Sequence, residues 1–264
     1  IIEGLVRTIK SDFKLIVTDN GSDEEYRNKL KELSHKDYDR VEFHFNDRNE
    51  GYISVHNKVA SKLKDEDFFC VLNDDLTFKE VGWDLRCIEE LKENPKLAEV
   101  GLIGPETFNV INAEGSGCLG KTVEYIEGSF IFMPSSIVKE VIESRGSLFS
   151  NEYDFIYAED SDLSLTLRER SYEIKLLPLK VEHKRFERKV NEKLGGGKYY
   201  DKKNRETFCR KWAWYLKHRK FERTILLKRE RGYGDILFLT PFIKTLKVNH
   251  PACKVYIKTA CPQA

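Results

Sequence analysis

The sequence lacks the features that mark several large classes of protein. It contains no apolar run near the ~20 residues that a membrane-spanning helix needs. Its 45 basic and 44 acidic residues give a formal net charge of +1, which disfavours a general binder of nucleic acids. The first ten residues, IIEGLVRTIK, have polar breaks and no small-residue cleavage site, which disfavours a secretory signal peptide. We therefore expect a cytoplasmic protein with no transmembrane segment and no nucleic-acid partner; peripheral association with a membrane stays open.

Paired cysteines and internal repeats are missing as well. The six cysteines form no CxxC motif, and Cys70 lies inside an apolar run, so a buried thiol is favoured over a disulfide. A chain of 264 residues that is 40% hydrophobic and 34% charged can still bury a large core. This length fits one large α/β domain, alone or with a fragment of another domain.

Helical and strand-like patterns alternate along the first 183 residues. Apolar residues at helical spacing predict helices, and alternating or continuous apolar runs predict strands. The predicted helices cover about 1–10, 24–33, 54–63, 83–94, 134–142 and 159–170, and the predicted strands cover 13–18, 41–45, 68–72, 100–105, 125–133 and 173–181. This order favours an α/β fold with an open, mostly parallel, twisted sheet flanked by helices.

The stretch FFCVLNDDLTF at Phe68–Phe78 is the most informative local signal. Five apolar residues suit a strand buried on both faces, and they run into Asn73, Asp74 and Asp75. Carboxylates at the carboxyl end of a buried parallel strand lie where open α/β sheets bind ligands. Oxygen ligands in that place suit Mg²⁺ or Mn²⁺, with a substrate phosphate completing the shell. A solvated polar turn is the competing interpretation.

Three further polar turns also follow predicted strands, the last of them the short apolar stretch at 155–158. They are Asp19-Asn20-Gly21-Ser22, Asn49-Glu50-Gly51 and Glu159-Asp160-Ser161-Asp162. Because successive strand ends of a parallel sheet collect on one edge, four such turns would form a cleft that attracts cations. Each turn also has a plainer interpretation, such as a left-handed turn at Gly51 or acidic residues that complement a helix dipole at 159–162. His183 follows a strand and is as readily structural or solvated as functional.

The composition changes after residue 183. Residues 184–222 are strongly basic and aromatic. The run Gly195–Lys198 has no strand before it and no Ser or Thr after the lysine, so a flexible linker or lid is favoured over a phosphate loop. A strand–helix–strand pattern restarts over 224–228, 236–247 and 254–257. Two strands and one helix cannot form an independent domain, so they predict a partial second α/β unit.

Five stretches occur in an order and at a spacing that match a known family. They are IVTDNGSDEE (16–25), NEGYISVHN (49–57), FFCVLNDDLTF (68–78), IEGSFIFMPSSIVKEV (126–141) and LFSNEYDFIYAEDSDLSLTLRERSYEIKLLPLKVEH (148–183). Together they resemble the family 2 glycosyltransferases of the GT-A fold, most of all the bacterial rhamnosyltransferase-type members. The resemblance implies an inverting, metal-dependent transfer from a nucleotide-diphosphate sugar to a glycan or lipid-linked acceptor, in surface polysaccharide or lipopolysaccharide synthesis.

The resemblance also implies roles for individual residues. Asp19 would hydrogen-bond the nucleotide base, and Asp160 would be the general base that deprotonates the acceptor hydroxyl. Asp75 would hold the divalent ion, Mg²⁺ or Mn²⁺, and His183 occupies a place where some relatives supply a further ligand. The matched motifs further imply donor-binding residues, namely Asn49, Gly51, Asp74, Gly128 and Glu159. Asn73 departs from a strict Asp-x-Asp motif, so which of residues 73–75 contacts the metal stays open.

Residues 223–260, RTILLKRERGYGDILFLTPFIKTLKVNHPACKVYIKTA, carry a second resemblance. They look like the opening of a family 9, heptosyltransferase-like domain of the GT-B type. We therefore expect a GT-A-like domain at 1–186, a basic helical linker at 187–222, and an incomplete GT-B-like domain at 223–264.

The family 2 enzymes begin with a strand and loop that precede the first helix predicted here. This implies a fragment without the central first strand, which binds nucleotide sugars weakly or not at all, unless residues 224–228 fill the vacant position. Two alternative functions stay open. One is a degenerate, non-catalytic fragment that binds sugar or nucleotide, and the other is a nucleotidyltransferase, for which no Gly-rich phosphate loop is visible.

Overall fold

The computed structural model describes residues 2–35, 38–102, 125–184, 196–218, 224–229, 241–244 and 254–259. Its helices are α1 (Ile2–Thr8), α2 (Glu24–Ser34), α3 (Tyr52–Ala60), α4 (Trp83–Glu93), α5 (Ser135–Arg145), α6 (Glu159–Glu169) and α7 (Gly196–His218). Its strands are β1 (Leu15–Asn20), β2 (Val41–Asn46), β3 (Phe68–Leu72), β4 (Leu76–Phe78), β5 (Leu97–Leu102), β6 (Phe130–Pro134), β7 (Glu173–Leu177), β8 (Val181–His183), β9 (Thr224–Arg229) and β10 (Lys254–Thr259). Within these ranges, no helix is long and apolar enough to cross a membrane.

The predicted alternation of helices and strands is confirmed, with shifted boundaries and three differences. The short strand expected at 155–158 is a loop, in which Phe155, Tyr157 and Ala158 have positive φ. Strand β4 was not predicted; it follows the turn after β3 and pairs antiparallel with β8. The single strand expected over 173–181 is divided into β7 and β8 around Pro178, which has no backbone N–H to donate to a ladder. Residues 103–124 and most of the helix expected at 236–247 lie outside the described residues.

The main sheet has the strand order β3-β6-β5-β7, and its strands do not all run in one direction. Strand β6 is antiparallel to both neighbours, whereas β5 and β7 are parallel. Of the three strand pairs that the described residues form in this sheet, one is parallel and two are antiparallel, so the sheet is less parallel than expected. The reason is that β6 starts beside the end of β3, where the Asn73 N–H donates to the Ser129 carbonyl (2.9 Å). A strand that starts where its neighbour ends must run back antiparallel to it.

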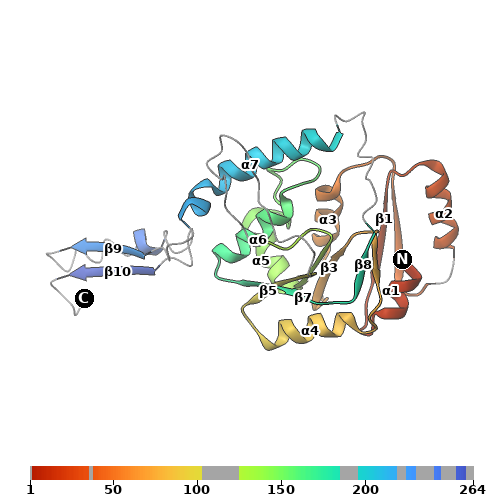
Figure 1. Cartoon of the computed structure of the whole chain (residues 1–264), viewed down its shortest axis with the longest axis horizontal. Helices are drawn as coiled ribbons and strands as arrows, with labels where there is room; N and C mark the ends of the chain where they lie inside the picture. Colours follow the sequence, from red (N-terminus) through yellow and green to blue (C-terminus); the bar gives the residue numbers. More distant parts are fainter. Residues whose placement is uncertain are drawn as a thin grey trace.

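Strand β3 separates two hydrophobic cores, so both of its faces are covered as the sequence predicted. Phe69 and Val71 pack in a core with side chains from α3, α5, α6 and α7. Phe68, Cys70 and Leu72 face a second core that is built around α1, α4 and β4. Figure 1 shows α7 on one side of this sheet and α4 on the other. The two cores hold the carboxyl end of β3 in place, and with it residues 73–75.

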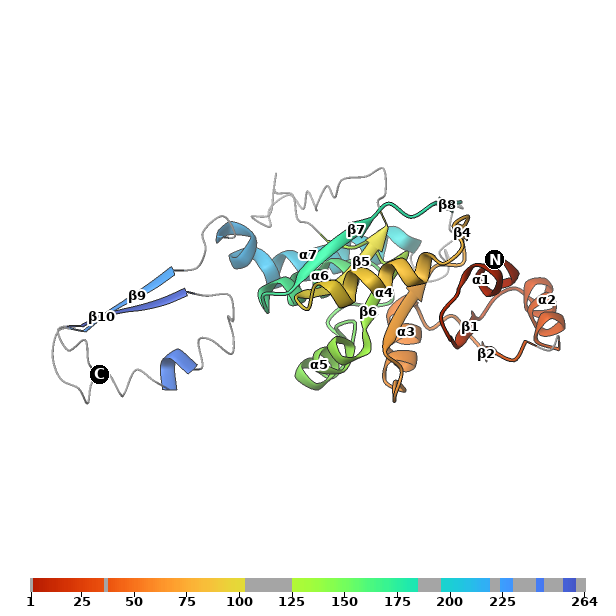
Figure 2. The ribbon, with the colours of Figure 1, turned by 90° about the horizontal axis from the view of Figure 1, so that it is seen from below.

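Besides β4 and β8, two further strand pairs in the described part of the chain lie outside the main sheet. Strands β1 and β2 are parallel and in register from Leu15↔Val41 to Asn20↔Asn46. Strands β9 and β10 pair in parallel with each other, and both views show them away from the body of the molecule (Figures 1 and 2). The alternative that residues 224–228 fill the vacant strand position is therefore wrong, because β9 and β10 form a separate two-stranded sheet.

Helix α7 lies within the segment expected as a basic linker, but it is packed against the main body. Phe208 and Cys209 are fully buried and Trp212 is 5% exposed, all three in the core on the α6 side of the sheet. Burial of two aromatic side chains typically contributes several kcal/mol, on the order of 1.5–3 kcal/mol each. This helix is therefore part of the folded unit that carries residues 125–184.

Candidate functional site

The ends of β1 and β2 are held together by the side chain of Asn20. Its Nδ2 donates to Asn49 Oδ1 (2.9 Å), and its Oδ1 accepts from the Glu50 N–H (3.0 Å). Asn49 Oδ1 also accepts from the Gly51 N–H at 2.9 Å. The Asn49 side chain therefore fixes the backbone of its own turn, and this amide oxygen is already occupied by protein donors.

Asp19 lies at the end of β1, beside the Asn20 turn, and only 3% of its surface is exposed. Its Oδ1 accepts from the Ser22 N–H (3.1 Å). Its Oδ2 has no hydrogen-bond partner within the described part of the chain and lies 3.6 Å from Nη1 of Arg27. A buried carboxylate oxygen without a donor is unfavourable, so Oδ2 is available to accept from an N–H of a ligand.

Tyr52, the first residue of α3, connects this region to Gly128 and Asp160. The Tyr52 hydroxyl donates to the Gly128 carbonyl (2.6 Å), and the Gly128 N–H donates to Asp160 Oδ2 (2.9 Å). A Cβ on Gly128 would lie 3.0 Å from the Tyr52 hydroxyl and 3.5 Å from Asp160 Oδ2, so this approach depends on glycine. The turns that precede α3, β6 and α6 therefore meet.

Asp160 is the second residue of α6, and its side chain is half-buried. Its Oδ1 accepts from the Ser161 N–H at 2.6 Å, opposite the Gly128 donor on Oδ2. Burial raises the pKa of the Asp160 carboxyl, and the N–H donors from Gly128 and Ser161 oppose that rise. A carboxylate that is held in place and has a raised pKa suits a general base. This arrangement can take a proton from a hydroxyl bound beside α6.

The turn after β3 joins the same region through its backbone. The Asn73 N–H donates to the carbonyl of Ser129, next to Gly128. Asp75 is 5% exposed, and its Oδ1 has no hydrogen-bond partner among the residues that the structure describes. This oxygen lies 3.3 Å from Nε2 of His183, whereas Asp74 is exposed to solvent.

Asp75 and His183 can supply two ligands to a divalent cation. A buried carboxylate oxygen beside an imidazole nitrogen suits Mn²⁺, which accepts both oxygen and nitrogen ligands. Mg²⁺ prefers oxygen ligands and would favour the carboxylate alone. No group of three or more His, Cys, Asp or Glu side chains in the described ranges could hold a metal. Mg²⁺ and similar ions commonly use one or two protein ligands together with waters and substrate phosphates, and these two residues can supply that share.

Two predicted donor-binding residues are buried at the starts of helices. Gly51 precedes α3 with a φ of 85°, and a Cβ there would lie 2.8 Å from the Phe155 carbonyl oxygen. Glu159 opens α6 and is 4% exposed. Neither offers much surface to a ligand, so in this structure they shape the turns that carry Asn49 and Asp160.

Sequence reasoning missed the role of Asp162, which was expected only as an acidic residue at a helix start. Asp162 is fully buried, and its carboxylate accepts from Arg145 Nη1 (2.7 Å), the Tyr153 hydroxyl (3.0 Å) and Trp212 Nε1 (2.9 Å). These donors come from α5, from the loop before α6 and from α7. No local pattern could have indicated them, because the partners are separated by up to 50 residues.

Glu99 on β5 is a second missed residue, and it contacts Ser164 in the middle of α6. It is fully buried, and its Oε2 accepts from the Ser164 hydroxyl (2.7 Å), which in turn accepts from the Ile126 N–H (2.9 Å). Burial raises the pKa of Glu99 to about 8, and the nearby Asp160 carboxylate adds to the rise. Glu99 is therefore mostly protonated at neutral pH and adds no negative charge beside Asp160.

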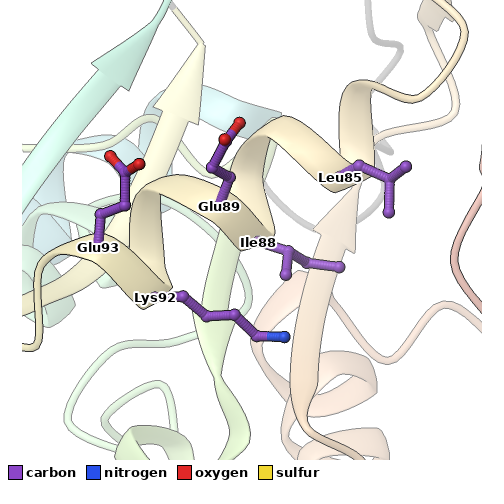
Figure 3. A pocket seen from close by; sticks show the side chains of 5 residues that line it. All are labelled: Leu85, Ile88, Glu89, Lys92 and Glu93. Atoms are coloured by element: carbon purple, nitrogen blue, oxygen red, sulfur yellow. The ribbon is translucent and has the colours of Figure 1, made fainter.

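One surface hollow lies away from these turns, and a second one borders them. One runs along α4 and is lined by Leu85, Ile88, Glu89, Lys92 and Glu93 (Figure 3). None of the predicted site residues lines it. The other lies between α3 and the loop before α6 and includes Glu50, Asp154 and Phe155. The second hollow therefore adjoins the turn at Gly51.

Comparison with known proteins gives a family match and a fold. Residues 1–115 match the model of glycosyl transferase family 2. No curated protein sequence matches the chain significantly. One similar solved structure is GalNAc-T7 with UDP, GalNAc and Mn²⁺, at 12% identity and a TM-score of 0.52, covering 69% of this chain and 40% of that chain. Another is the mannosyltransferase PcManGT from Pyrobaculum calidifontis in complex with GDP-Man and Mn²⁺, also at 12% identity and a TM-score of 0.52.

The second similarity covers 96% of this chain and 77% of that one, whereas the chain spans about 40% of the length of GalNAc-T7. At this identity the similarity establishes architecture. The mixed α/β fold of this chain is that of the GT-A glycosyltransferases, and its residues 1–115 match glycosyl transferase family 2.

Proposed function

We propose that the protein is a glycosyltransferase that binds a nucleotide-sugar donor at the turns that follow its strands. One observation carries the proposal: a chain of contacts joins four separate turns into one region. It runs from Asn20 and Asn49 through Gly51 to Tyr52, and from Tyr52 through Gly128 to Asp160. The Asn73–Ser129 hydrogen bond adds the turn that carries Asp75. The family match over residues 1–115 covers three of these turns.

The donor side of the site is assigned to Asp19 and the neighbouring Asn49 turn. Asp19 Oδ2 is buried and lacks a donor among the described residues, so it can accept from an N–H of a nucleotide base. Asn49 and Gly51 shape the adjoining turn, and Asp74 is exposed beside Asp75. We assign Gly128 and Glu159 to the same surface as residues that hold Asp160 and the start of α6 in place.

The reaction side of the site is assigned to Asp160. As general base it would take the proton of the acceptor hydroxyl while that oxygen bonds to the anomeric carbon and the bond to the diphosphate breaks. The diphosphate leaves with the bonding electron pair. The Gly128 N–H holds one carboxylate oxygen and the Ser161 N–H the other, which fixes the carboxylate orientation that proton transfer requires.

Asp75 and His183 are proposed to hold a divalent ion, with the Asn73 backbone fixing the turn. When bound, such an ion stabilises the negative charge of a leaving diphosphate as a Lewis acid. Both similar solved structures contain Mn²⁺, which supports Mn²⁺ as the first ion to test.

The finer assignments are proposals of the same kind. We propose an inverting hexosyl or rhamnosyl transfer to a glycan or lipid-linked hydroxyl in polysaccharide synthesis in the cytoplasm. The resemblance of 223–260 to the start of a heptosyltransferase-like domain stays a prediction, as does the division at 186 and 222. Within the described residues, no structural observation favours the nucleotidyltransferase alternative.

The test is a donor screen with the protein expressed from its complete gene. Mass spectrometry of product, with UDP-, GDP- and dTDP-sugars and Mn²⁺, identifies the donor that supports transfer. The variant Asp160→Asn keeps the size of the side chain but cannot take up the proton. We expect at least a ~10²-fold loss of kcat with donor binding retained, as for removal of a general base. Transfer by Asp160→Asn at the wild-type rate would contradict the assignment of the base, and absence of transfer from every donor would contradict the function.

A further inference from the structure

The loop before α6 has an unusual backbone. Three of its residues that are not glycine have positive φ, namely Phe155 (62°), Tyr157 (84°) and Ala158 (68°). Side chains disfavour this region of φ, and residues held there are stabilised by their surroundings. Ala158 is the N-cap residue of α6, and its carbonyl accepts from the Asp162 N–H at 3.0 Å. The strained loop therefore sets where α6 begins, and with it the place of Asp160.

Asn204 on α7 makes three hydrogen bonds to this loop with one side chain. Its Oδ1 accepts from the Asp154 N–H (3.0 Å), and its Nδ2 donates to the carbonyls of Asp154 (2.7 Å) and Ile156 (2.8 Å). Asn204 is fully buried. These three bonds require a side chain with two N–H donors and one acceptor, and no other side chain as short as that of asparagine provides them.

Two further contacts from α7 support the same loop. The Phe155 ring stacks on Tyr200 with centroids 4.9 Å apart and planes 18° apart. Asp154 forms an ion pair with Lys203. On the opposite side, the Phe155 carbonyl accepts from the Ile53 N–H (3.2 Å) near the Gly51 turn. The loop is thus held between α7 and the start of α3.

We propose that Asn204 is a positioning residue for the transfer reaction. It holds the strained 154–158 loop, and through it the start of α6, in the arrangement that presents Asp160 beside the Gly51 turn. The inference rests on the proposed function, and it adds a residue that lies well outside the family match at 1–115. A residue that served only general packing would not direct all three of its hydrogen bonds to the strained segment.

Asn57 provides a matched control. It makes the same kind of side-chain pairing with the backbone of Phe149, donating from Nδ2 to the carbonyl (2.8 Å) and accepting from the N–H (2.8 Å). Phe149 lies at the far end of the segment between α5 and α6, before the strained residues. Asn204→Ala and Asn57→Ala therefore remove the same kind of side-chain-to-backbone hydrogen bond, three at Asn204 and two at Asn57, and only those of Asn204 hold the loop before Asp160.

The experiment combines amide exchange with steady-state kinetics in the protein expressed from its complete gene. Asn204→Ala is expected to increase exchange over residues 153–160 and to lower kcat by about 10- to 100-fold, with the donor KM changed less than about threefold, as for a misplaced catalytic group. Asn57→Ala is expected to keep kcat within about twofold of the wild type. Adding Ala158→Gly to Asn204→Ala is expected to recover part of the loss, because glycine adopts the positive φ without strain.

The outcomes separate the two proposals. An unchanged kcat in Asn204→Ala overturns the positioning role, and so does a loss of kcat in Asn57→Ala as large as that in Asn204→Ala. The glycosyltransferase function stays intact in both cases, because the wild type still transfers sugar. A wild-type protein that transfers no sugar overturns the function, and the positioning role with it. If Asn204→Ala does not fold, Tyr200→Leu removes the Phe155 stack instead; it is expected to lower kcat by more than about threefold, and an unchanged kcat counts against the proposal.

Discussion

Replacing Glu99 by glutamine should remove a pH dependence of stability that the wild type shows. Glu99 is fully buried, its Oε2 accepts from Ser164, and its Oε1 has no hydrogen-bond partner among the described residues. Burial and the Asp160 charge raise its pKa from 4.5 to about 8 in the folded state. Because the folded protein holds this proton more tightly than the unfolded chain, its stabilising effect is complete below pH 4.5 and is lost as the pH rises toward 8.

The size of the effect follows from the shift. At about 1.4 kcal/mol per pKa unit, a rise from 4.5 to about 8 corresponds to an upper limit of roughly 5 kcal/mol between acidic and alkaline pH. The glutamine side chain cannot ionise, its amide oxygen can still accept from Ser164, and any cost of its unpaired amide is the same at every pH. The stability of Glu99→Gln relative to the wild type should therefore increase between about pH 5 and 8 and level off above that.

Urea denaturation at several pH values measures this difference directly, with the free energy of unfolding extrapolated to water. Glu89→Gln, on the exposed face of α4, is the control that removes the same charge without burial. Curves of unfolding free energy against pH that stay parallel for the wild type and Glu99→Gln from about pH 5 to 8 would contradict this prediction. That result would mean that Glu99 ionises as readily in the folded protein as in the unfolded chain.

Three further predictions concern the site and its supports. Gly128→Ala places a Cβ 3.0 Å from the Tyr52 hydroxyl, so kcat should fall about tenfold, and Tyr52→Phe should restore part of it in kinetic assays. Asp162→Asn leaves Arg145 buried without its carboxylate, and thermal or urea unfolding should show a loss of about 3–5 kcal/mol. Because the pKa of Asp160 is raised, the acidic limb of the kcat–pH profile should lie above the range of an ordinary aspartate; a limb below about pH 4 would contradict the role of Asp160 as base.

The sequence predicted the parts of the fold that depend on local pattern. The run FFCVL predicted β3 with both faces buried, and the two cores on either side of it confirm that interpretation. The same run placed Asn73, Asp74 and Asp75 at the strand end, where Asp75 is now found beside His183. These features follow from neighbours in the chain, which a sequence displays directly.

The direction of β6 and the separation of strand pairs could not be predicted. An apolar run such as Phe130–Pro134 is the same whether its neighbours run parallel or antiparallel. The positive φ values at Phe155, Tyr157 and Ala158 also carry no sequence signature, since none of these residues is a glycine. The loop that carries them is hydrogen-bonded to Asn204, about 50 residues further along the chain, and contacts over that distance arise only from packing.

The proposed function requires that the turns at the strand ends form one metal-dependent site for a nucleoside diphosphate. Calorimetric titration of UDP, GDP and dTDP, with and without Mn²⁺, into the protein expressed from its complete gene measures this. We expect at least one of the three to bind only with Mn²⁺, and its binding to weaken about tenfold or more in both Asp75→Asn and Asp19→Asn. Binding that is equally tight without Mn²⁺ and in both variants would contradict it.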